Sequence, residues 1–140
     1  MSANLSLKVA TNVEDLRRAQ DEIEAFCNAQ AWPADVVFQI GLVVEELGIN
    51  VVNYAYEDGA EHEFSISVTS DDGSLTLEIV DGGQAFDPLE DAPEPDLDAS
   101  LEDRPIGGLG VYLVRTIMDE LSYRREDGHN RLTAIKRRPE

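Results

Sequence analysis

Five stretches of the chain alternate hydrophobic and polar residues, which is the period of a β-strand with one buried face. These stretches are Leu5–Val9, Glu63–Ser70, Leu75–Val80, Leu121–Arg125 and Arg131–Lys136. The second and third are separated by Asp71-Asp72-Gly73, and the last two flank Asp127-Gly128. Since short Asp-Gly segments favour tight turns, each of these two pairs predicts a β-hairpin.

Three further segments predict helices, the first two from apolar residues at helical spacing and the third because it follows a run of glycines. They are Val13–Ala29, Asp35 to about Tyr56, and Val111–Glu120. Thr11 or Asn12 can cap the first helix, and Trp32-Pro33 ends it. The element order βααββαββ predicts an α+β fold, a two-layer α/β sandwich whose sheet is mixed but mainly antiparallel, with the helices on one face.

Size and charge narrow the class of protein. The 140 residues fit one domain, over residues 1–140. The net charge of −18 argues against a nucleic-acid partner, because phosphate backbones are bound by clusters of Lys and Arg. No apolar run reaches the roughly 18 residues of a membrane-spanning helix. Cys27 is the only cysteine, so no internal disulfide can form and we expect a cytoplasmic protein.

The second predicted helix carries a polar group of residues with helical spacing. Glu46 and Asn50 are four residues apart and share a face, and Asn53 follows one turn later. We expect this face to lie roughly opposite the apolar stripe of the same helix, which consists of Val37, Ile40, Val44, Leu47 and Val51. An amide oxygen can ligate a hard cation and a carboxylate can orient a nucleophile, so the spacing suits a metal–phosphate site. Taken alone, the same residues also fit an ordinary solvated face.

Asp81 ends a predicted strand and is followed by Gly82-Gly83. A lone carboxylate at this place can accept a hydrogen bond from an adenine amino group, and Gly83 lets a flat ring approach the backbone. An ordinary Asp-Gly turn would show the same pattern. The next segment, Asp87–Arg104, is rich in acids and prolines and predicts a surface excursion.

The glycine run Gly107–Gly110 opens the third predicted helix. Backbone amides at a helix N-terminus form a natural cradle for phosphate groups. A flexible hinge before a helix would use the same residues. No Walker lysine follows the glycines, so this segment is not a P-loop.

Together, and in this order, the three motifs resemble the nucleotide site of the GHKL superfamily, whose ATP-binding domain has the Bergerat fold. In that superfamily an E-x-x-x-N helix, a D-x-G-x-G loop and a glycine-rich helix start follow one another. Here they are Glu46–Asn50, Asp81–Ala85 and Gly107–Gly110, with Ala85 in place of the third glycine of the loop. The stand-alone anti-sigma-factor serine kinases are the most similar members. The segments that carry this resemblance are Glu45–Tyr56, Ala85–Pro88 and Gly107–Arg115, and Met118–Glu120 and Asn130–Thr133 add to it.

The resemblance implies an ATP-dependent serine/threonine protein kinase that uses Mg²⁺. It implies that Asp81 receives the adenine amino group, that Asn50 ligates the metal ion, and that Glu46 acts as general base toward a serine hydroxyl. It also implies a wider set of nucleotide-binding residues. These are Asn53, Gly83, Ala85, Gly107, Gly108, Leu109, Gly110 and Thr133.

The resemblance further implies partners in bacterial signalling. The substrate would be a STAS-domain anti-anti-sigma protein, the inhibited target a sigma factor, and the kinase itself a homodimer. Two alternatives stay open, because the phosphate acceptor lies on another chain. One is an ATP-dependent binding switch that transfers no phosphate, and the other is a slow ATPase.

Overall fold

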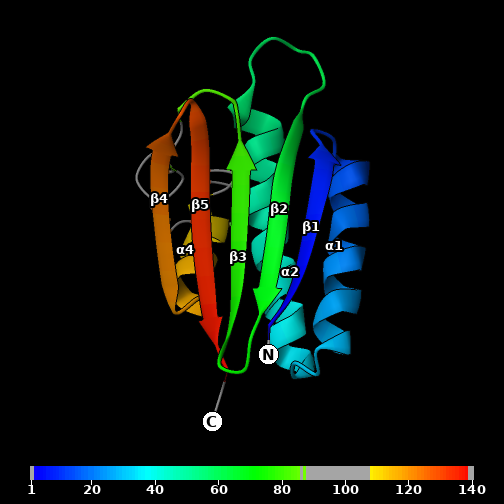
Figure 1. Ribbon diagram of the computed structural model, residues 1–140. Coiled ribbons are helices and arrows are strands. Elements are labelled where there is room, and N and C mark those ends of the chain that lie inside the picture. The colour runs from blue at the N-terminus through cyan, green and yellow to red at the C-terminus, as the bar shows by residue number, and fades with distance from the viewer. Residues whose placement is uncertain (1, 86, 88–107, 139–140) are drawn as a thin grey trace.

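The structure is a computed structural model that describes residues 2–85, 87 and 108–138. One sheet forms the front layer in Figure 1, and three helices lie behind it. The elements in chain order are β1 (Ala3–Ala10), α1 (Val13–Ala29), α2 (Ala34–Asn50), the π-helix η1 (Val51–Ala55), β2 (Glu63–Ser70), β3 (Ser74–Asp81), α4 (Gly108–Ile117), β4 (Glu120–Glu126) and β5 (His129–Arg137).

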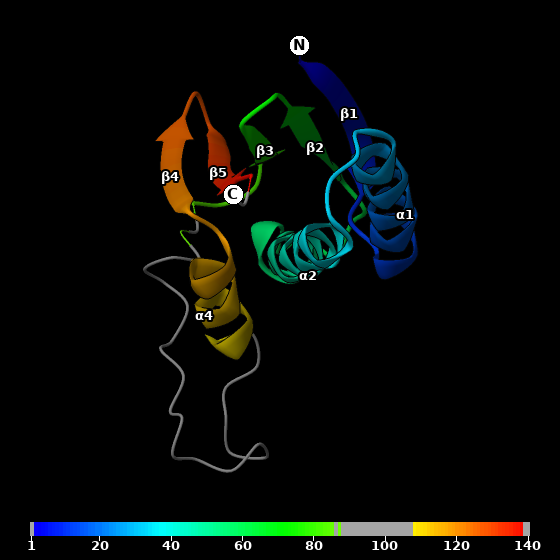
Figure 2. The ribbon, with the colours of Figure 1, turned by 90° about the horizontal axis from the view of Figure 1, so that it is seen from below.

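The sheet has five strands in the order β1-β2-β3-β5-β4, so β5 lies between β3 and β4. All four neighbouring pairs are antiparallel. The α+β sandwich, both hairpins and the helices on one face are therefore confirmed (Figure 2). No parallel pair occurs in the described strands, because β3 and β4, which run in the same direction, are separated by β5.

The first predicted helix is confirmed over Val13–Ala29. Asn12, one of its two predicted caps, accepts a hydrogen bond at Oδ1 from the Asp15 backbone N–H at 2.8 Å. The second helix covers its predicted range, Asp35 to about Tyr56, but it is not α-helical throughout. Its α-helical part ends at Asn50, and the wider turn of η1 continues to Ala55. Such π-helical turns are rare and occur frequently at functional sites.

The third helix is shifted toward the N-terminus relative to its prediction. It is Gly108–Ile117 rather than Val111–Glu120. It ends early because the following residues join the sheet, where the Asp119 backbone N–H donates to the Ile135 carbonyl at 2.9 Å. None of the helices in the described ranges is long and apolar enough to cross a membrane.

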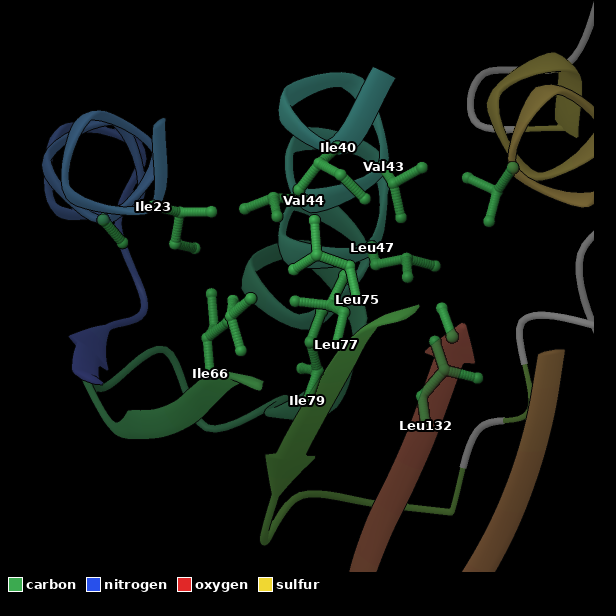
Figure 3. Packing of buried hydrophobic residues seen from close by; sticks show 14 of the residues in the cluster. Ile23, Ile40, Val43, Val44, Leu47, Ile66, Leu75, Leu77, Ile79 and Leu132 are labelled. Carbon is green, nitrogen blue, oxygen red and sulfur yellow. The ribbon is translucent and has the colours of Figure 1, made fainter. Parts of the chain in front are cut away.

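A hydrophobic core fills the space between the sheet and the helices (Figure 3). Helix residues and strand residues point toward one another there, and each buried aliphatic side chain contributes about 1.5–3 kcal/mol. The residues labelled in the figure are Ile23, Ile40, Val43, Val44, Leu47, Ile66, Leu75, Leu77, Ile79 and Leu132. Every second residue of β3 is buried, and this alternation ends at Asp81. Asp81 therefore lies on the helix side of the sheet, at the edge of the core.

Candidate functional site

Asp81 is buried at the end of β3, with 7% of its surface exposed. Its Oδ1 accepts two hydrogen bonds, from the Gly83 backbone N–H at 3.0 Å and from Asn130 Nδ2 at 2.9 Å. No group within the described residues donates to its other oxygen, Oδ2. Asp81 as a whole is largely buried and lines a pocket, so this oxygen, which keeps its acceptor capacity, is suited to accept a hydrogen bond from a ligand.

A pocket lies between the end of α2, η1 and the ends of three strands. It contains about 380 Å³ of space between atoms, including the part that is open to solvent. Its walls are mainly apolar and carry a few polar groups, which is typical of small-molecule sites. The lining residues are Leu47, Asn50, Val51, Ala55, Ile79, Asp81, Tyr123, Asn130 and Leu132. Asn50 and Asp81, which come from two separate sequence motifs, therefore line one pocket.

Asn50 is buried, with 7% of its surface exposed, and its face does not lie opposite the apolar stripe as predicted. The buried surface of α2 is wider than that stripe and also includes Val43 and Gly48. Asn50 Nδ2 and Glu46 Oε1 are buried without a hydrogen-bond partner among the described residues. Such atoms are uncommon in native proteins. Two of them one helical turn apart fit a polar ligand with its own donors and acceptors, as a metal–phosphate group is.

Glu46 lines a groove between α2 and α4, beside the apolar residues Leu42 and Leu113. Burial raises the pKa of its carboxyl group, and the neighbouring Glu45 carboxylate raises this pKa further. A general base works best when its pKa lies near the working pH. The surroundings of Glu46 therefore shift its pKa in the direction that favours a general base.

The loop after Asp81 is fastened to the end of η1. The Gln84 backbone N–H donates to the Ala55 carbonyl at 2.7 Å, and Gln84 Nε2 donates to the Tyr54 carbonyl at 2.6 Å. A Cβ on Gly83 would lie 2.1 Å from the Ala55 oxygen. Only glycine fits this close approach of two backbones. Backbone packing thus requires glycine at position 83, in addition to the predicted contact of Gly83 with the adenine ring.

A family model described as histidine kinase-like ATPase domain matches residues 9–136. The chain belongs to this family. The match extends from β1 into β5, so it includes every element that lines the pocket. The resemblance inferred from the three motifs is thereby confirmed.

Three curated proteins are similar to this chain in sequence. The serine/threonine-protein kinase BtrW of Bordetella bronchiseptica is 36% identical over 102 residues, which cover 73% of this chain and 71% of BtrW. The serine-protein kinase RsbW of Halalkalibacterium halodurans is 28% identical over 109 residues, which cover 76% of this chain and 66% of RsbW. The anti-sigma F factor of Clostridium beijerinckii is 29% identical over 140 residues, which cover 99% of this chain and 96% of that protein.

A solved structure shows the same fold. The crystal structure of the RsbU and RsbW domains of Rv1364c from Mycobacterium tuberculosis superposes with a TM-score of 0.70. The match covers 98% of this chain and 33% of that chain, at 13% sequence identity. At this identity the likeness concerns the fold alone.

The other residues predicted to bind the nucleotide lie on several different elements of the structure. Asn53 and Ala85 are exposed, on η1 and on the loop after β3. Gly108, Leu109 and Gly110 form the first turn of α4, which packs against α2 (Figure 2). Gly107 and the predicted surface excursion, apart from Asp87, lie outside the described residues.

Thr133 lies on the face of the sheet that points away from the helices. It alternates on β5 with Leu132 and Ala134, which are buried on the helix side, and it pairs with Glu78 on β3. The pocket is on the helix side. The structure therefore does not bring Thr133 to the predicted site, because a neighbouring strand residue always faces the opposite way.

Two residues that the sequence analysis did not assign to the site complete the pocket. Asn130 Nδ2 donates to Asp81 Oδ1 at 2.9 Å and to the Gln84 carbonyl at 2.8 Å, and the Tyr123 hydroxyl donates to Asn130 Oδ1. The pairing of Asp81 with Asn130 in the sheet places the two side chains together. A polar residue in the inward alternation of β5 is the signal that could have identified Asn130.

Proposed function

We propose that this protein is an ATP-dependent serine/threonine kinase of the anti-sigma-factor type, whose substrate is a serine of a STAS-domain anti-anti-sigma protein. One observation carries the proposal. The pocket that contains the free oxygen of Asp81 also contains Asn50, which lies one helical turn from Glu46. The names of the relatives BtrW, RsbW and anti-sigma F factor support the same function.

Each residue of the proposed site has a defined role in binding. Asp81 accepts the adenine amino group at Oδ2, and Asn50 binds Mg²⁺ together with the phosphates. When bound, the ion neutralises phosphate charge and so favours phosphoryl transfer. In the parts of the chain that the structure describes, no group of three His, Cys, Asp or Glu side chains is arranged to hold a metal ion. The ion would therefore depend on the nucleotide for most of its ligands, which is usual for Mg²⁺.

In this proposal Glu46 takes the proton of the acceptor serine at a carboxylate oxygen. Phosphoryl transfer depends mainly on positioning and on charge neutralisation, so one base and a well-held nucleotide suffice. The net charge of −18 favours partner proteins with basic surfaces. The sigma factor as inhibited target, the homodimer and the cytoplasmic location stay predictions.

Radiolabelled phosphate transfer tests this function directly. The parent protein, incubated with Mg²⁺, γ-labelled ATP and a cognate STAS protein, should label a serine of the STAS protein. Glu46→Ala should bind ATP nearly as the parent does and transfer about 10²–10⁴ times more slowly. Glu24→Ala removes an exposed carboxylate on α1, outside the site, and serves as the matched control, with transfer retained.

The other two functions predict different results in the same assay. A binding switch would bind ATP and label no protein. A slow ATPase would release inorganic phosphate at the same rate with and without the STAS protein. Full transfer by Glu46→Ala would show that another group acts as the base, and Glu45 would be the first candidate.

A further inference from the structure

We infer that Asn130 and Tyr123 are positioning residues that make the pocket selective for a purine with a 6-amino group. They act through Asp81, by holding its carboxylate so that Oδ1 is occupied and Oδ2 is left for the ligand. This inference rests on the proposed function, because it concerns the base-binding end of the same site. It adds a residue-level account of which nucleobase the site accepts.

A chain of hydrogen bonds connects the three side chains across three strands. The Tyr123 hydroxyl on β4 donates to Asn130 Oδ1 on β5, and Asn130 Nδ2 donates to Asp81 Oδ1 at the end of β3. Asn130 is 5% exposed and Asp81 is 7% exposed, so water competes little for these bonds. All three residues line the pocket, yet Tyr123 reaches Asp81 only through Asn130.

The amide of Asn130 can satisfy its neighbours in one orientation. Its nitrogen donates to two acceptors, Asp81 Oδ1 and the Gln84 carbonyl at 2.8 Å, and its oxygen accepts from the Tyr123 hydroxyl. Turning the amide by 180° would set its oxygen against both acceptors and lose the bonds to them. Tyr123 therefore helps to fix the orientation of Asn130, and Asn130 fixes which oxygen of Asp81 is engaged.

This arrangement presents acceptors and no spare donor to the 6-position of a purine. Both hydrogens of Asn130 Nδ2 are used within the protein, and the carboxylate of Asp81 has none. The amino group of adenine can donate to Asp81 Oδ2. The oxygen at the same position of guanine or hypoxanthine would face the carboxylate, acceptor against acceptor. A site built to bind a donor rejects an analogue without it, because its own buried group stays unpaired.

Purine riboside 5′-triphosphate, which lacks only the 6-amino group, allows the inference to be measured. Calorimetry with Mg²⁺ gives the affinity of each protein for ATP and for this analogue. The parent should prefer ATP by about tenfold or more, as expected for a hydrogen bond to a charged group. Tyr123→Phe should reduce this preference about threefold, and Asn130→Ala should nearly abolish it. Both variants should bind the analogue almost as the parent does.

Ser122→Ala is the matched control. Ser122 is on β4 next to Tyr123, but it is exposed on the opposite face of the sheet and should leave the preference unchanged. If a variant binds both nucleotides more weakly by the same factor, the residue only supports the fold and the inference is overturned. An unchanged preference in Tyr123→Phe and Asn130→Ala also overturns it. If Asn130→Ala does not fold, Tyr123→Phe decides alone, because it removes one hydroxyl.

The parent separates this inference from the proposed function. If the parent does not bind ATP, both the proposed function and the inference fail. If it binds ATP and the analogue equally, the site does not recognise the 6-amino group and the inference fails, while the proposed kinase function is unaffected. If the parent prefers ATP and the variants keep that preference, only the roles of Asn130 and Tyr123 are lost.

Discussion

Asp81→Asn is the substitution that tests the pocket most sharply, because it should spare the fold and remove one contact with the ligand. The two side chains have nearly the same size. The amide oxygen can still accept from the Gly83 backbone N–H and from Asn130 Nδ2, the two bonds of 3.0 and 2.9 Å that Asp81 Oδ1 accepts. The amide nitrogen then takes the place of Oδ2. It presents a donor to the adenine amino group, which is itself a donor.

The expected loss follows from that single reversed contact. A hydrogen bond to a charged group contributes roughly 1.5–3 kcal/mol. Since 1.4 kcal/mol corresponds to tenfold in affinity, the Kd for Mg-ATP should rise about 10–100-fold. The free energy of unfolding without nucleotide should change by less than about 1 kcal/mol, because both internal hydrogen bonds of Asp81 are kept.

Calorimetry with Mg-ATP and thermal unfolding without nucleotide measure the two quantities. Asp127→Asn makes the same chemical change in the exposed turn before β5, where the φ of 53° is one that Asn tolerates, and should alter neither. If Asp81→Asn is folded and binds Mg-ATP with the affinity of the parent, Asp81 does not contact the nucleotide. A large loss of stability would refute the argument that the amide keeps both internal bonds.

Three further substitutions test other parts of the site and its support. Asn50→Ala should bind ATP equally with Mg²⁺ and with a chelator, whereas the parent should need Mg²⁺, and calorimetry under both conditions compares them. Folding raises the pKa of Glu46 above its ordinary value of 4.5. The folded state therefore loses stability relative to the unfolded state as the pH rises from 4.5 through the higher pKa of the folded protein, because Glu46 ionises less readily when folded. Glu46→Gln should therefore raise the Tm by a few degrees at pH 7 and leave it unchanged at pH 4, and an equal gain at both pH values would contradict this cause. In Gly48→Ala the new Cβ would lie 2.5 Å from Leu16 Cδ1 in the core, which should lower the free energy of unfolding by about 1–2 kcal/mol in urea. In Gly41→Ala, on the same helix, the new Cβ meets no atom within 4 Å, and the substitution should raise the free energy of unfolding by about 0.5–1 kcal/mol. A lower free energy of unfolding in Gly41→Ala would show that the room around the new Cβ does not decide whether the substitution stabilises the protein.

Hydrophobic periodicity predicted most of the elements, because each strand and helix buries one face against the same core. It did not predict the position of β5 between β3 and β4, which depends on pairing between distant segments. It also missed the π-helical turn at Val51–Ala55, since a local change in helical hydrogen bonding leaves little trace in the hydrophobic pattern. The same limit explains why the sequence did not predict that Asn50 is buried. The pattern gave its position along α2, whereas the width of the buried surface is set by the neighbouring elements.

The site shows the same division between local and distant information. Glu46, Asn50 and Asp81 could be proposed from the sequence because each belongs to a short contiguous motif. Asn130 was missed because its contact with Asp81 arises from strand register, which no single segment contains. Thr133 was placed in the site although it faces away from it, and on a strand an error of one residue is enough to reverse the face.

The position of β5 has a consequence for the newly made chain. Asn130 follows Asp81 by 49 residues, yet the two strands are neighbours in the sheet. At about 5–20 residues per second, the ribosome needs roughly 2–10 s to add this stretch. During that time the outer edge of β3 has no partner from β5, and unpaired edges of this kind invite association with other chains. Chaperone protection would therefore matter most in the interval between the synthesis of β3 and that of β5.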